Sequence, residues 1–108
     1  MINEIKVRFR KYVTIRWSDV LLLPREYAIA FIKECQKESI IILGIDGFYL
    51  TPTTVQPSMD NSINFSDPES EEYKTKDRYQ SSINFLEERD PKMYFEIVCK
   101  TNNPNRTG

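Results

Sequence analysis

Hydrophobic and polar residues alternate along the first part of the chain. From Ile5 to Trp17 the odd positions are apolar except for Lys11, and the even positions are mostly basic. A period of two predicts a long or bulged β-strand with an apolar face toward the core and a basic face toward water. The stretch would form either one long strand or a pair of strands bent near Arg10-Lys11. No Gly or Asn marks a tight turn, which favours a long or bulged strand over a two-residue hairpin.

A helical period comes next. Pro24 suits the first turn of a helix. Apolar residues then recur at the spacing of one helical face, at Tyr27, Ala28, Phe31, Ile32 and Cys35. We expect this helix to end near Glu38-Ser39, where a β-branched run begins. Apolar residues continue from Ile40 to about Leu50, which predicts a buried second strand.

The following stretch, residues 51–64, has the composition of a loop, with two prolines and many small polar residues. Long loops in compact domains are often functional. Ser66-Asp67-Pro68-Glu69 is a capping box, which predicts the start of a second helix. Its apolar positions are Tyr73, Tyr79, Ile83 and Leu86. Asp90-Pro91 is expected to stop it.

The last alternating segment, Met93 to Cys99, predicts a strand, and the polar residues 101–108 predict a flexible C-terminal tail. The order strand, helix, strand, helix, strand predicts an α+β fold. In it, two helices pack on one face of a small, mainly antiparallel sheet. A chain of 108 residues is expected to form a single domain, here residues 1–100.

Composition narrows the class of protein. At 40% apolar and 29% charged residues the chain is typical of a globular domain. The longest apolar run, Ile40–Ile45, is too short to span a bilayer, and Met1–Lys11 is unlike a signal peptide, so a cytoplasmic protein without membrane contact is expected. Cys35 and Cys99 fall on apolar faces and are predicted to be buried free thiols rather than a disulfide.

Charge is segregated along the chain although its net value is only -1. Residues 1–38 hold eight Lys and Arg against five Asp and Glu, whereas residues 39–92 hold five against ten. This polarity suits steering toward a charged macromolecular partner. The alternative is two solvated faces without a partner.

Catalytic chemistry has little support in this sequence. There is no histidine, no Cys-x-x-Cys pair and no Gly-rich phosphate loop, so no catalytic residue, cofactor or metal ligand is predicted. Asp46 and Asp60 are the one alternative, because paired carboxylates suffice for acid–base catalysis or for Mg²⁺. As turn formers they would instead be solvated, without raised pKa values.

The basic face of the predicted first strand supports a second alternative. Lys6, Arg8, Arg10 and Arg16 would project together and present their charges to phosphates. The acidic sequence pI of about 5.5 argues against nucleic acid as the partner. A small non-enzymatic nucleic-acid-binding or regulatory module is therefore kept as the alternative function.

Two short motifs are the most distinctive part of the chain. Leu43-Gly44-Ile45-Asp46, with Tyr49 shortly after it, stands at a predicted strand end, and Pro57-Ser58-Met59-Asp60-Asn61 follows in the predicted loop. This pattern resembles the immunity protein 40 family, predicted antitoxins of bacterial polymorphic toxin systems. The likeness extends from Trp17 to the Tyr94-Phe95 strand. Ile45 stands where the family tends to have Gly, and Ser62 where an aromatic tends to follow Asp-Asn.

The resemblance implies a protein that binds and neutralises a cognate toxin by direct contact and has no chemistry of its own. The acidic middle of the chain is the expected toxin-binding surface. Its predicted residues are Asp46, Tyr49, Asp60, Asn61, Phe65, Asp67, Glu69, Glu71 and Glu72. Tyr49 and Phe65 would be the aromatic anchors, with the carboxylates setting the association rate. The toxin's identity and the oligomeric state stay open.

Overall fold

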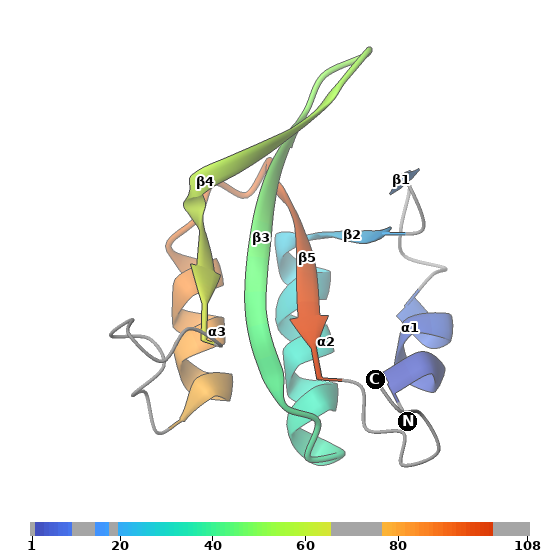
Figure 1. Cartoon of the computed structure of the whole chain (residues 1–108), viewed down its shortest axis with the longest axis vertical. Helices are drawn as coiled ribbons and strands as arrows, with labels where there is room; N and C mark the ends of the chain where they lie inside the picture. Colours follow the sequence, from blue (N-terminus) through green and yellow to red (C-terminus); the bar gives the residue numbers. More distant parts are fainter. Residues whose placement is uncertain (1, 10–14, 18–19, 66–76, 101–108) are drawn as a thin grey trace.

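The computed structural model describes residues 2–9, 15–17, 20–65 and 77–100. Within these ranges the chain forms α1 (Ile2–Phe9), β1 (Ile15–Trp17), β2 (Val20–Pro24), α2 (Arg25–Lys37), β3 (Ile42–Leu50), β4 (Val55–Asn64), α3 (Arg78–Glu87) and β5 (Tyr94–Cys99). The fold is α+β with helices packed against an antiparallel sheet, which confirms the predicted fold class (Figure 1). The predicted C-terminal tail and the Ser66 capping box lie outside the described residues.

The sheet has the strand order β1-β2-β5-β3-β4, and every pairing in it is antiparallel. The last strand in the sequence, β5, is thus the central one. Its pairing with β2 is brief, through Leu23 with Phe95 and Pro24 with Tyr94, whereas its pairing with β3 runs nearly its full length. The β3–β4 hairpin projects beyond the helices at the top of Figure 1, and α2 runs behind β3 and β5.

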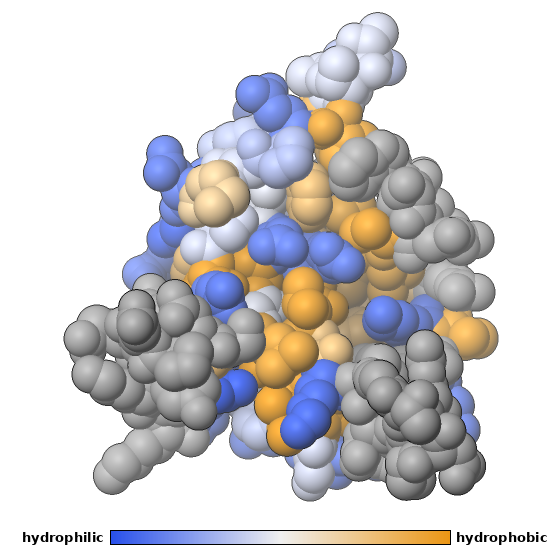
Figure 2. All heavy atoms as spheres, viewed as in Figure 1, coloured by the Kyte–Doolittle hydropathy of each residue, from blue (hydrophilic) through white to orange (hydrophobic). Residues whose placement is uncertain are grey.

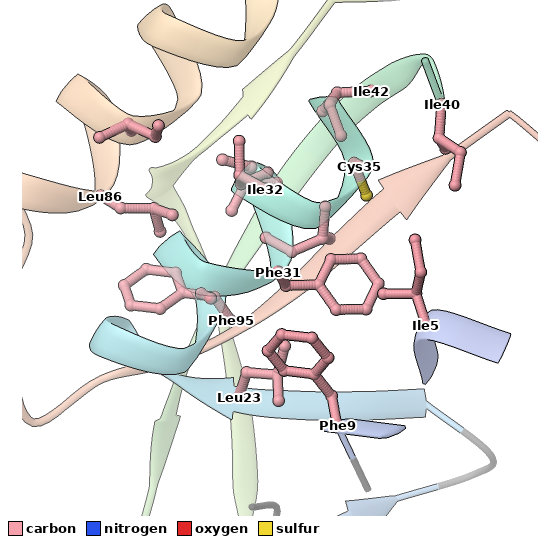
Figure 3. Close-up of a cluster of buried hydrophobic side chains, with 14 of the residues drawn as sticks. Ile5, Phe9, Leu23, Phe31, Ile32, Cys35, Ile40, Ile42, Leu86 and Phe95 are labelled. Atoms are coloured by element: carbon pink, nitrogen blue, oxygen red, sulfur yellow. The ribbon is translucent and has the colours of Figure 1, made fainter. Parts of the chain in front are cut away.

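One cluster of buried side chains joins the helices to the sheet (Figure 3). Phe31 of α2 is 1% exposed and packs edge-on against Phe9 of α1, with ring centroids 5.2 Å apart. From β5, Phe95 and Ile97 enter the same cluster, while their neighbour Glu96 belongs to the opposite face. The predicted period of two along the last strand is therefore confirmed.

The predicted first helix is also confirmed, since α2 begins directly after Pro24. Its end has an explicit cause. Ser39 adopts a φ of 56°, and the Ile40 N–H donates to the Cys35 carbonyl at 2.8 Å, which closes the last turn. The chain then enters β3 two residues later than the β-branched run suggests.

The prediction of one long strand from Ile5 to Trp17 is wrong. Residues 2–9 form α1, and only residues 15–17 of this stretch are described as a strand. Ile5 and Phe9 are buried and lie four positions apart, a spacing that fits one helical face as well as one strand face. Val7, which a strand would bury with them, is 59% exposed. Tertiary packing against α2 therefore decided between two periods that the sequence satisfies equally.

The prediction of a loop over residues 51–64 is also wrong. Only Thr51 to Thr54 form the turn, closed by a 2.9 Å bond from the Thr51 N–H to the Thr54 carbonyl. The rest is β4, an edge strand. An edge position tolerates Pro57, which has no N–H to donate, and water satisfies the polar side chains. Loop composition and edge-strand composition are hard to tell apart for this reason.

The predicted second helix is confirmed only in its later part. Asp77 has an extended backbone, and its side chain accepts a hydrogen bond from the Gln80 N–H at 3.0 Å, so α3 starts with Asp77 as its N-cap. One helix running on from Ser66 is therefore excluded. Among the described helices, the longest has 13 residues and none has the length and apolar character that crossing a membrane requires.

Candidate functional site

The two sequence motifs face each other across the β3–β4 hairpin. Ile45 pairs with Ile63, but Gly47 pairs with Ser58, so the single residue Asp46 is opposed by residues 59–62 of β4. Such a bulge bends the strand and re-aims its side chains. We call Tyr49, Ser58, Met59, Asp60 and Asn61, which lie at and beside this bulge, the hairpin site. The first motif thus lies within β3 rather than at its end, and the predicted loop motif forms the bulge.

Side-chain and backbone bonds close the bulge. The Gly47 N–H donates to the Ser62 hydroxyl at 3.1 Å, and that hydroxyl donates to the Ser58 carbonyl at 2.7 Å. A Cβ at Gly47 would lie only 2.3 Å from the Asn61 carbonyl oxygen, so the bulge needs glycine opposite it. Gly44 is similarly restricted, by the Ile63 carbonyl oxygen at 2.7 Å. Both glycines are explained by the close approach of β4.

Asn61 is the centre of a small polar network. Its Nδ2 group donates to the Ser58 hydroxyl at 2.9 Å and to the Tyr49 hydroxyl at 3.3 Å. Its Oδ1 atom accepts from Nη1 of Arg89 at 3.4 Å. The Arg89 guanidinium also stacks 4.4 Å from the centre of the Phe85 ring on α3. The network therefore ties the hairpin to the end of α3 and holds Tyr49 and Asn61 together, as the predicted site requires.

Arg89 is a residue that the sequence analysis missed. Besides its contacts with Asn61 and Phe85, its backbone carbonyl accepts from Nη1 of Arg25 at 3.0 Å. No spacing rule connects an arginine after a helix to an asparagine in a preceding strand. Its role is visible only once the sheet is assembled.

Exposure distinguishes the residues of the hairpin site. Met59 is 86% exposed and Tyr49 is 44% exposed, whereas Phe48, the residue before Tyr49 in β3, is 5% exposed. The predicted separation of Phe48 and Tyr49 onto opposite faces is confirmed. Asp60 is also exposed. The hairpin site thus presents an aromatic ring, a thioether and a carboxylate to the surroundings.

The prediction of Phe65 as an exposed anchor is wrong. Phe65 is fully buried in the main cluster, its N–H donates to the Leu43 carbonyl at 2.8 Å, and the Arg78 guanidinium lies 5.8 Å from its ring centre. The continuing sheet carries its ring into the core. Four other predicted residues lie outside the described part of the chain: Asp67, Glu69, Glu71 and Glu72.

Asp46 lies on a different face from Tyr49, because three positions separate them along β3. Its direct cross-strand neighbour is Glu96 of β5. Partial burial raises the pKa of both carboxyls, and the charge of Asp46 raises that of Glu96 further, while Lys6 opposes it. Figure 2 shows the face of the sheet turned away from α2, where hydrophobic and hydrophilic side chains are mixed. The carboxylates of Asp46 and Glu96 are thus like charges on directly paired residues of β3 and β5.

The geometry bears on both alternative functions. Asp46 and Asp60 are exposed as expected, but the expectation of an unshifted pKa is wrong for Asp46. Within the described ranges, no three His, Cys, Asp or Glu side chains gather in an arrangement suited to a metal ion. The basic strand face does not exist over residues 2–9, because they are helical. Arg10 and the side chains of Arg8 and Arg16 lie outside the part of the chain that the structure describes.

No protein-family model matches this chain, and no curated protein matches its sequence. The likeness to the immunity protein 40 family therefore stays a prediction that rests on the two motifs. What the structure adds is their placement. Gly47 and Asn61 are required by one local geometry, in which the motifs contact each other.

Proposed function

We propose that this chain is a cytoplasmic immunity protein that binds a bacterial toxin through the hairpin site and neutralises it by direct contact. The observation that carries the proposal is the meeting of the two motifs at the β4 bulge. Residues that look unrelated in sequence share one surface there. A bulge that re-aims exposed side chains on an edge strand is a feature typical of binding sites.

The hairpin site has the composition of a small binding surface. Tyr49 supplies a large ring whose hydroxyl is already oriented by Asn61, and Met59 supplies an adaptable apolar side chain. Because the polar network fixes the ring before binding, little side-chain entropy is lost on association. Tyr49 and Met59 are therefore the proposed anchors, and Phe65 has no such role.

Exposed carboxylates give the site its charge. Asp60 stands in the bulge, and Glu88 and Asp90 stand on either side of Arg89, whose guanidinium contacts Asn61. All three acidic residues are exposed. Negative charge at the bulge and after the end of α3 suits a toxin with a basic surface, and it accelerates encounter more than it strengthens the complex.

The anchors are tested with the toxin encoded by the neighbouring gene. We expect Tyr49→Ala to speed dissociation at least tenfold and to abolish rescue of toxin-expressing cells, because an aromatic anchor contributes about 2 kcal/mol or more. Tyr49→Phe, which keeps the ring, should retain most of the affinity. Val7→Ala is the matched control, since Val7 is an exposed apolar residue on α1. Equal dissociation rates for Tyr49→Ala and Val7→Ala would contradict the proposal.

The charges are tested by association kinetics at two salt concentrations. Asp60→Lys should slow association and flatten its salt dependence, with little change in dissociation. Glu38→Lys, at an exposed position after α2, is the control for a change in net charge alone. If both variants slow association equally, net charge rather than the hairpin site steers the toxin.

A further inference from the structure

The two cysteines of the chain lie side by side although 64 positions separate them. Cys35 is on α2, and Cys99 is the last residue of β5. Their sulfur atoms are 3.9 Å apart, and both are free thiols. In Figure 3 the Cys35 sulfur points from α2 toward β5. No other contact in the described core brings two reactive side chains together in this way.

The two thiols differ in access. Cys35 is 0% exposed and belongs to the main cluster, whereas Cys99 is only partly buried. A small oxidant can therefore reach the Cys99 sulfur first. Cys35 is then the only thiol close enough to react with an oxidised Cys99.

The surrounding charges favour the same order. A hydrogen bond from Cys35 lowers the pKa of the Cys99 thiol, burial opposes this, Lys6 of α1 lowers it further, and Glu96 raises it. The pKa of Cys35 is raised far above its usual value, by the bond to Cys99, by burial and by Glu34. Tyr79 of α3, whose hydroxyl donates to the Ile40 carbonyl at 2.7 Å, also faces the pair. Cys99 is thus the better nucleophile.

We propose that Cys35 and Cys99 form a reversible disulfide when the protein meets hydrogen peroxide. The Cys99 thiolate attacks one peroxide oxygen, the O–O bond breaks, and the departing hydroxide takes a proton to become water. The Cys35 sulfur then attacks the sulfur of the Cys99 sulfenic acid, the S–O bond breaks, and hydroxide leaves with the Cys35 proton as a second water. Two thiols and one peroxide thus give one disulfide and two waters.

The consequence is a clamp between α2 and the central strand. For the bond to form, the two sulfur atoms must approach from 3.9 Å to about 2.05 Å. Because the linked residues enclose most of the domain, the disulfide restricts the unfolded chain strongly. We expect oxidation to raise the Tm by roughly 5–15 °C. The clamp is independent of the toxin-binding proposal.

The experiment uses the purified full chain, reduced and then treated with one equivalent of hydrogen peroxide without denaturant. We expect the intact mass to fall by two hydrogen atoms, a Cys35–Cys99 linked peptide to appear, and dithiothreitol to reverse both changes together with the rise in Tm. A mass gain of two or three oxygens on Cys99, or linkage only in denaturant, would overturn the proposal.

Single variants separate the roles of the two thiols. Cys35→Ser should accumulate a sulfenic acid at Cys99 that dimedone traps, because the second thiol is missing. Cys99→Ser should react at least tenfold more slowly with peroxide, since Cys35 is buried. Circular dichroism establishes that each variant is folded. Should either variant unfold, the linked peptide from the unmodified chain still decides the question, and a Cys99→Ser variant that reacts as fast as the native chain contradicts the assigned order.

Discussion

The hydrophobic core between α2 and the sheet differs from the β3–β4 hairpin in how its structure is held together. The core fills its space with large apolar side chains such as Phe31, Phe95 and Ile97, which are at most 4% exposed. The hairpin leaves the apolar side chain of Met59 86% exposed and fixes its shape with hydroxyls, an amide and glycine. Apolar burial stabilises the fold more than a polar bulge on an edge strand does.

Stability and binding are therefore expected to depend on different parts of the molecule. If the hairpin were only structural, an ordinary two-residue turn and a regular ladder would serve better. Its bulge instead requires Gly47, Ser62 and Asn61 together. Changes in the core should therefore lower stability without altering binding by the folded protein, and changes in the hairpin should alter binding more than stability.

The largest effect is expected in the core. Phe31→Ala removes a buried ring from the contact between α1 and α2 and should lower the free energy of unfolding by about 3–5 kcal/mol. Guanidinium denaturation measures the loss. If stability resides in the core and binding in the hairpin, the folded fraction of this variant should dissociate from the toxin at an unchanged rate. A faster rate would place binding residues within reach of the core.

The second largest effect is expected at Gly47. Gly47→Ala would place a Cβ against the Asn61 carbonyl oxygen, 2.3 Å away in the present geometry, so the bulge must move. We expect a loss of about 2–3 kcal/mol in stability and a clear loss of toxin affinity. Gly44→Ala is the matched variant. Its Cβ would also lie close to a backbone oxygen, at 2.7 Å, but at a position outside the bulge. Equal affinity losses in the two variants would show that the bulge itself has no special role.

A smaller effect on stability is expected at Ser62. Ser62→Ala removes the acceptor of the Gly47 N–H and the donor to the Ser58 carbonyl. The substitution should lower the free energy of unfolding by about 1–2 kcal/mol. Amide hydrogen exchange should quicken at Gly47 while the amides of β5 keep their protection. Uniformly faster exchange would mean that hairpin and core unfold as one unit and would remove the distinction between them.

The smallest effect concerns the Asp46–Glu96 pair. Because folding raises both pKa values, the unfolded chain loses these protons first as the pH rises, and stability falls from about pH 4 until the folded carboxyls have ionised too. Glu96→Gln should therefore add up to about 1 kcal/mol at pH 7 and little at pH 3. Glu26→Gln is the control at an exposed position. A stability gain that does not depend on pH would point to a cause other than charge.

The sequence was sufficient for those elements whose period has only one solution. In α2 the apolar residues Ala28, Phe31 and Ile32 fit a helix alone, and in β5 the alternation of Phe95 and Ile97 fits a strand alone. Ile5 and Phe9 fit both periods, so the contact with Phe31 decided for a helix. Local patterns cannot contain that information, since it depends on which surface packs against the segment.

The candidate site was predicted in part for a similar reason. The family resemblance pointed to Tyr49, Asp60 and Asn61, and the bulge explains the contact between Tyr49 and Asn61. Phe65 was expected at the site but is buried, whereas Arg89 was not expected and contacts Asn61. Both outcomes depend on strand register and on where α3 ends. A one-residue change in register moves a side chain to the other face, so exposure near a bulge cannot be read from the sequence.

The position of β5 in the sheet has a consequence for biosynthesis. It is the last of the described strands to leave the ribosome, yet in the described sheet it is the strand that pairs with both β2 and the β3–β4 hairpin. Until Phe95 and Ile97 are translated, the nascent chain has a helix and a hairpin whose apolar faces lack their common partner. Such late, long-range strand pairing slows folding and leaves apolar surface exposed while the chain grows. The described sheet is therefore complete only once β5 has been translated.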